Sequence, residues 1–176
     1  MSRNMSAIVV NLGLAGIVAL ASAGVALAGT TAQISATVTA QNVSITLTSD
    51  GSVAYGTQSL SNTPDTTTGT YGVDDTQTVQ NNGNVAEDFT IQGANSTNWS
   101  LAATAGANQY GYKFCTTTCD TTPSWTSMNN ATGVSLSTSV GAGSSKDVDF
   151  QLLMPTSDSS GYAEQSFNVT ITAAAS

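Results

Sequence analysis

Apolar and polar residues alternate with a period of two through most of the chain after residue 30. One series of apolar residues takes the even positions of residues 34–40, and a second takes the odd positions of residues 43–47. This alternation places apolar side chains on one face of an extended strand and polar side chains on the other. No stretch after residue 28 has a convincing helical period. The pattern therefore predicts an all-β fold.

Further strand candidates follow at short, regular spacing. They are residues 52–55, 76–80, 89–92, 99–103, 110–114, 134–138, 148–153 and 167–172. Clusters of Gly, Asn, Asp and Pro separate them, as turns require. Short strands with such turns indicate one antiparallel β-sandwich of immunoglobulin-like or jelly-roll type, and we assign it to residues 43–176.

The change of parity between the first two apolar series falls at Gln41 and Asn42. A slip of one residue turns every following side chain to the opposite face of a strand. A bulge, kink or hinge is therefore expected at this dipeptide. Residues 29–42 are predicted to form an N-terminal strand followed by that hinge.

The first 28 residues have the pattern of a secretory signal peptide. Arg3 precedes an apolar run over residues 7–28, which ends in Ala26-Leu27-Ala28. Cleavage after Ala28 predicts a secreted, extracellular protein at the cell surface, with no membrane association after cleavage. Two alternatives remain open, a retained anchor helix and a pilin-like helix kept in a filament core.

Charge and composition narrow the function classes. The chain has 3 Lys and Arg, 11 Asp and Glu and no His, with a formal net charge of −8. Nucleic acid is an unsuitable partner for such a surface. Without His or a phosphate-binding loop the chain is expected not to be an enzyme, and no catalytic residue or cofactor is predicted. Calcium could bind oxygen ligands, and Asp74 and Asp75 are weak candidates for it.

Cys115 and Cys119 are the only cysteines. An exported chain meets an oxidising compartment, which favours a disulfide between them. A metal site would need further ligands, and two free thiols are the remaining alternative. The short spacing predicts a bridge that closes the tip of a loop.

Aromatic residues near this loop suggest a second kind of site. Trp125, Tyr110 and Tyr112 are candidates for a glycan-binding face, because flat rings stack on sugars, although packing in the core is an alternative for each. The chain also holds five sequons for N-glycosylation. They lie at Asn42, Asn95, Asn98, Asn130 and Asn168.

Two segments resemble secreted immunoglobulin-like modules. Residues 78–91 are similar to the hairpin of those modules that reads V-x-N-x-G-N followed by F-x-I, and residues 165–172 are similar to their last strand. In layout, a leader, a free strand and a sandwich resemble the TasA/camelysin-type matrix fibre proteins and archaeal donor-strand pili. The resemblance is of layout and not of sequence motifs.

This resemblance implies assembly by β-strand donation between copies of the same chain. The apolar face of the donated strand would be Ile34, Ala36, Val38 and Ala40. The expected function is that of a structural subunit of an extracellular filament or surface layer. The alternative is a monomeric surface adhesin or glycan-binding module, with surface glycans as the partner.

Overall fold

The computed structural model describes residues 34–68 and 73–176. The predicted signal peptide lies outside the described residues. Residues 39–176 form one compact unit, and residues 34–38 belong to a separate one. In the described residues no helix is long or apolar enough to span a membrane.

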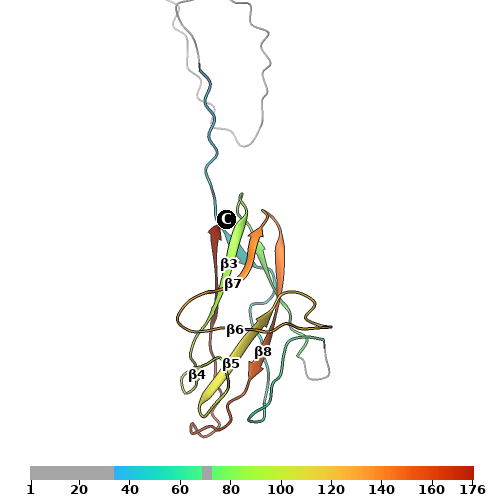
Figure 1. Ribbon diagram of the computed structural model, residues 1–176, viewed down its shortest axis with the longest axis vertical. Coiled ribbons are helices and arrows are strands. Elements are labelled where there is room, and N and C mark those ends of the chain that lie inside the picture. The colour runs from blue at the N-terminus through green and yellow to red at the C-terminus, as the bar shows by residue number, and fades with distance from the viewer. Residues whose placement is uncertain (1–33, 69–72) are drawn as a thin grey trace, which may run out of the picture. The chain divides into compact units, whose positions relative to one another are not determined.

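The described chain contains nine strands and no helix, which confirms the all-β prediction (Figure 1). The strands are β1 Ile45–Leu47, β2 Gln77–Asn81, β3 Glu87–Gly93, β4 Ser100–Leu101, β5 Gln109–Cys115, β6 Thr126–Ser127, β7 Val134–Val140, β8 Ser145–Leu153 and β9 Val169–Ala175.

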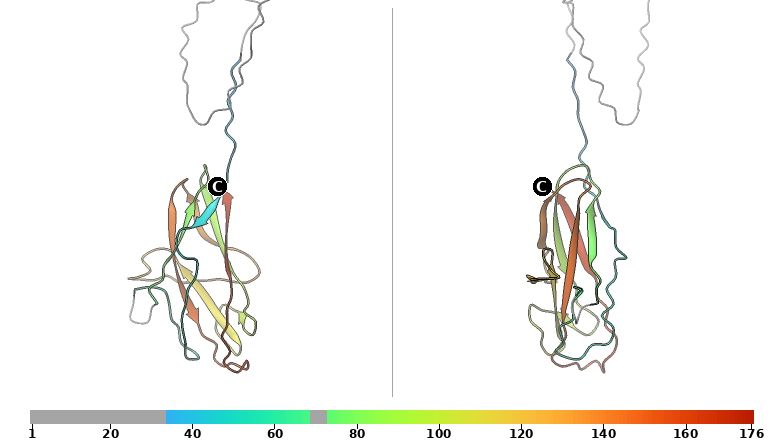
Figure 2. Two further views of the ribbon diagram at one scale, coloured as in Figure 1. Left: turned by 180° about the vertical axis from the view of Figure 1, so that it is seen from behind. Right: turned by 90° about the vertical axis from the view of Figure 1, so that its right-hand side faces the viewer.

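The strands form two sheets, consistent with a β-sandwich (Figure 2). The larger sheet has the order β1-β2-β8-β5-β4, with β6 paired to β5, and the smaller sheet has the order β7-β3-β9. All pairs of strands are antiparallel except β4 with β5. The edges of the smaller sheet are therefore β7 and β9.

The core draws on both sheets. Along β3 every second residue is buried, and Phe89 and Ile91 have no exposed surface. From β5, Tyr110 and Tyr112 enter the same core, and the Tyr112 ring stacks on Phe150 with centroids 5.3 Å apart. Burial of such large rings is the main source of stability in a domain of this size.

Two predicted strands are not strands in the structure. Residues 34–40 and 52–55 have no strand assignment, whereas the short β6 was not predicted. Predicted strand 99–103 shortens to the two residues of β4. Alternation reports which face of the chain is apolar, but a strand also needs a partner that supplies hydrogen bonds.

Candidate functional site

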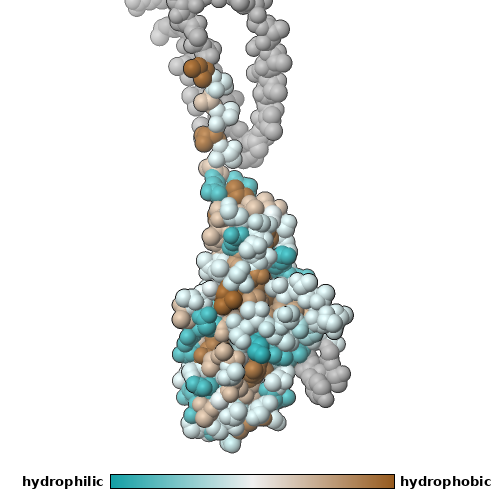
Figure 3. Space-filling model, in the orientation of Figure 1, coloured by the Kyte–Doolittle hydropathy of each residue, from teal (hydrophilic) through white to brown (hydrophobic). Residues whose placement is uncertain are grey.

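The leading segment, residues 34–38, has the alternating pattern but no strand partner in the described part of the chain. All its side chains are exposed, and Ile34 and Val38 expose 94% and 96% of their surface. Figure 3 shows hydrophobic side chains separated by polar ones along it. Exposed apolar residues at every second position are unusual for a finished fold.

The next residues, 40–44, are held against the connection between β2 and β3. We call this arrangement the clasp. The Asn84 amide donates to Ala40 O at 2.8 Å and its Oδ1 accepts from Asn42 N at 2.8 Å. Glu87 Oε1 accepts from Ser44 N at 2.9 Å. Ala40, predicted as part of the donated strand, thus lies in the clasp, and so does Asn42 of the predicted hinge.

The clasp fits tightly because of Gly83. A Cβ atom at this position would lie 2.3 Å from Glu87 Oε1 and 2.4 Å from Asn42 O, so only glycine allows the approach. The neighbouring Asn81 side chain accepts from Gly83 N at 2.7 Å and donates to Val85 O at 2.8 Å, which fixes the turn. The sequence predicted a turn here, but no local pattern indicated that Asn84 and Glu87 bind residues 40–44.

Glu87 is an unusual residue to find in this place. It is fully buried, and its Oε2 atom has no hydrogen-bond partner in the described residues. A buried carboxylate oxygen without a partner is costly, so the hydrogen bond from Ser44 matters more than one on the surface.

Part of the core is covered by residues that are only half-buried, and we call this part the open seam. We define it by two segments, residues 45–55 and 167–173. Apart from Val134, the half-buried apolar residues that pack on the core all come from these two segments: Ile45, Val53, Tyr55, Phe167, Val169, Ile171 and Ala173.

Contacts with single core residues show that the two segments face the same part of the core. Tyr112 touches Tyr55 and Phe167, with ring centroids 6.3 and 4.8 Å away. In the described residues β1 pairs only with β2, and β9 pairs only with β3. The seam therefore has apolar surface and an unpaired strand edge side by side.

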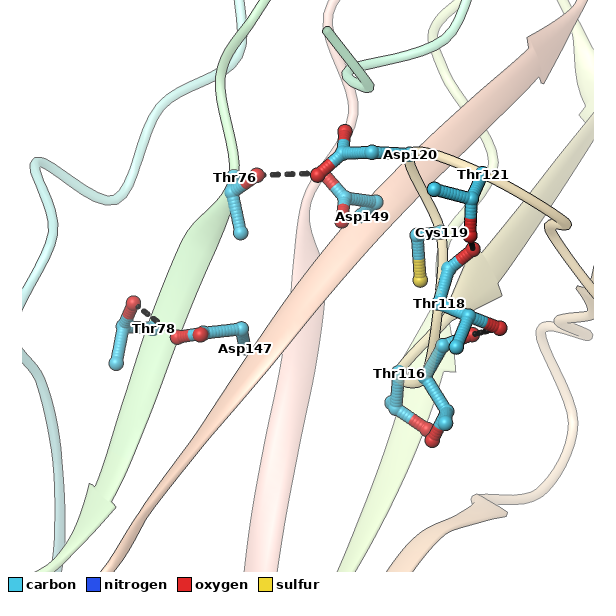
Figure 4. A pocket seen from close by; sticks show the side chains of 10 residues that line it. Thr76, Thr78, Thr116, Thr118, Cys119, Asp120, Thr121, Asp147 and Asp149 are labelled. Atoms are coloured by element: carbon cyan, nitrogen blue, oxygen red, sulfur yellow. Dashed lines mark hydrogen bonds between the residues drawn. The ribbon is translucent and has the colours of Figure 1, made fainter.

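The predicted disulfide is confirmed. Cys115 and Cys119 are bonded, with their Cα atoms 5.9 Å apart, and their loop borders an open hollow of about 660 Å³ (Figure 4). The lining consists mainly of hydroxyl and carboxylate groups: Thr76, Thr78, Thr116, Thr117, Thr118, Asp120, Thr121, Asp147 and Asp149.

The two carboxylates that β8 contributes to this hollow, Asp147 and Asp149, accept hydrogen bonds from threonine hydroxyl groups of the same domain. Asp149 Oδ1 accepts from Thr66 and Thr76 at 2.9 and 2.7 Å, and Asp147 accepts from Thr78 at 2.7 Å. Burial raises the pKa of the Asp149 carboxyl above its ordinary value. In the part of the chain that the structure describes, no three His, Cys, Asp or Glu residues are grouped as a metal site would need. The two carboxylates tie β8 to Thr78 of β2, to Thr76 just before it and to Thr66.

The weak calcium candidates are not brought together with further ligands in the described ranges. Asp74 has a positive φ of 47° and is exposed. The Asp75 carboxylate accepts from Gln77 Nε2 at 2.6 Å, which ties it to β2.

The three aromatic candidates do not form one surface. Tyr110 and Tyr112 expose 0% and 3% of their area in the core, so their rings cannot stack on a sugar in this fold. Trp125, in contrast, is only half-buried. Packing in the core was the alternative for both tyrosines, and the structure places them there.

The five sequon asparagines are all exposed. Asn95 and Asn130 lie together, because the Asn130 amide donates to Asn95 Oδ1 at 2.9 Å. Asn42 contributes backbone groups to the clasp, and Asn98 and Asn168 lie at other points of the surface.

In comparison with known proteins, the chain matches no family model, no curated protein and no solved structure.

Proposed function

We propose that this protein is an exported structural subunit of an extracellular filament or cell-surface layer, built on an immunoglobulin-like sandwich and assembled by β-strand donation. The observation that carries the proposal is the leading segment: it has a strand pattern, exposed Ile34 and Val38, and no partner strand in the described residues. Its partner would be another copy of the same chain.

Energetics favour such a partner. Full burial of a Val or Ile side chain contributes about 1.5–3 kcal/mol relative to exposure. Pairing along a strand edge would also satisfy backbone groups that now depend on solvent. An unpaired strand of this kind is a template for association, and proteins that do not use one normally block it with charge or proline. Residues 34–40 contain neither.

The clasp supports the same function, because it fixes the point at which the leading segment leaves the domain. Asn84 holds both Ala40 and Asn42, so a load on the segment is transferred to the β2–β3 connection. A filament subunit needs such an attachment. A surface made mainly of hydroxyl and amide groups with few charges also suits close packing of identical subunits.

The first prediction compares two neighbouring substitutions in the segment. Val38→Asp places a charge on the apolar face, where burial without a partner costs several kcal/mol, and should abolish filaments. Thr37→Asp places the same charge on the opposite face and should permit them. Negative-stain microscopy and sedimentation of the secreted protein measure filament formation. Thermal unfolding verifies that both variants fold.

A chain beginning at Val43 provides a second comparison. It loses both hydrogen bonds to the Asn84 side chain, so it should fold with a free energy of unfolding lower by about 1–3 kcal/mol and remain monomeric. Filaments from this shortened chain, or from Val38→Asp, would contradict strand donation. For the alternative of a monomeric glycan-binding module, only Trp125 retains some exposure among the predicted aromatic residues.

A further inference from the structure

The open seam is the surface best suited to receive the leading segment. Along it, Val169, Ile171 and Ala173 face the core but remain half-exposed, and the outer edge of β9 has no strand partner in the described residues. We infer that residues 34–38 of a second copy pair with β9 and cover this seam. The inference rests on the proposed function and identifies its acceptor.

The other edge of the smaller sheet is unsuited to the same role. The pairing of β7 with β3 shifts register twice, between Glu87 and Phe89 and between Phe89 and Thr90. Ser139 on β7 has a positive φ of 51°, and its N–H donates to the Asp88 carboxylate at 2.7 Å. Such irregularities discourage the addition of a strand. In contrast, β9 pairs with β3 in continuous register over its whole length.

The fold also determines the direction of pairing. The leading segment leaves the domain at the β2–β3 connection, where Asn84 holds Ala40. The C-terminal end of β9 lies at the same connection, because Ser176 N donates to Ala86 O at 3.0 Å. If all subunits point the same way along a filament, the segment enters the next subunit at the end opposite that subunit's own clasp. There it runs antiparallel to β9. A segment folding back onto its own β9 would run parallel.

Side-chain size selects one antiparallel register. Opposing residues share a face of the sheet, so Ile34, Ala36 and Val38 must face the inward residues of β9. In one register the pairs are Ile34 with Ala173, Ala36 with Ile171, and Val38 with Val169. Each pair then combines a large with a small side chain or two of middle size, which fills the seam evenly.

The outward face agrees with this register. Ser35 would lie opposite Thr172, and Thr37 opposite Thr170. Cross-strand pairs of Ser and Thr stabilise antiparallel sheets through their hydroxyl groups. The added strand would therefore continue the alternation of β9, with apolar residues inward and hydroxyl residues outward.

Double-cysteine variants of the full-length protein test this register. Val38→Cys with Val169→Cys places thiols on opposing residues, at a spacing that a disulfide accepts. Oxidised filaments should give a ladder of covalent multimers on a non-reducing gel. Thr37→Cys with Val169→Cys places the thiols on opposite faces and should give none. Ile34→Cys with Val169→Cys, the pair expected for a parallel strand, should also give none.

A reciprocal exchange of size tests the same contact without cysteine. Ala36→Ile and Ile171→Ala should each reduce filament yield several-fold, and the two together should restore most of it. Filaments that form normally while the ladder is absent, or a disulfide confined to single chains, or losses that simply add, would overturn the acceptor assignment and leave strand donation standing. Failure of the unaltered protein to form filaments would instead contradict the proposed function.

Discussion

Single side chains decide how the leading segment is attached. Asn84 offers one donor and one acceptor, and each reaches a different backbone group of residues 40–42. Gly83 removes the side chain that would keep Glu87 and Asn42 apart. These contacts join residues more than 40 positions apart, so no local pattern in the sequence could predict them. The turn itself could be predicted from its Asn and Gly content.

Substitution of Asn84 tests the clasp. Asn84→Ala removes both side-chain hydrogen bonds, each worth about 0.5–1.5 kcal/mol, so the free energy of unfolding should fall by about 1–3 kcal/mol. Filament growth should slow as the segment loses its fixed exit. Asn84→Asp keeps the acceptor for Asn42 N and should have a smaller effect on growth. Denaturant unfolding and light scattering measure the two quantities, and equal growth rates for all three proteins would exclude this role.

Asp149 gives a prediction about pH. Burial raises its folded-state pKa, so the stability linked to this group is fully present below the ordinary Asp pKa and is lost as pH rises through the folded value. Asp149→Asn keeps an oxygen for Thr66 and Thr76 but carries no charge. The variant should therefore gain thermal stability relative to the unaltered protein at pH 7 and show less gain near pH 3.5.

The exposed Asp147 on the same strand supplies the control. Asp147→Asn removes a charge from an exposed position of the same hollow, so it controls for the loss of a charge alone. A difference for Asp149→Asn that is constant from pH 3.5 to 7 would show that burial of the charge is not the cause.

At the scale of elements, the sequence predicted which face of a strand is buried better than it predicted which strand pairs with which. Strand β3 was predicted from its alternation, and the structure buries those alternate residues. Residues 34–38 have an equally regular pattern but no partner in the described chain. Hydrogen-bond partners depend on topology, which a local pattern does not contain. The open seam could not be predicted for the same reason, since it arises between the first and last elements of the sandwich.

The disulfide loop provides an element-scale prediction that separates stability from assembly. Replacing Cys115 and Cys119 together by Ala should cost about 2 kcal/mol, since a bridge across so few residues restricts the unfolded chain only modestly. Filament yield should be unchanged, because the loop follows β5 of the larger sheet, whereas the proposed acceptor β9 is an edge of the smaller sheet. Denaturant unfolding and microscopy of the double variant provide the check, and a loss of filaments with little loss of stability would place the loop at a subunit contact.

At the scale of the whole molecule, two incomplete features have matching properties. The leading segment offers an alternating apolar face without a partner, and the seam offers half-covered core residues beside an unpaired strand edge. Joined between copies, each would complete the other, and the polymer would repeat one contact in a head-to-tail manner. Burial of apolar side chains and hydrogen bonding along the strand edge would drive such a contact.

Hydrogen exchange of the backbone amides in monomer and filament tests the central claim most directly. The account predicts that the amides of residues 34–38 exchange rapidly in the monomer and become strongly protected in filaments. The β9 amides that point away from β3 should become protected with them. Filaments in which residues 34–38 still exchange as a free chain would contradict it, as would protection of those residues already in the monomer.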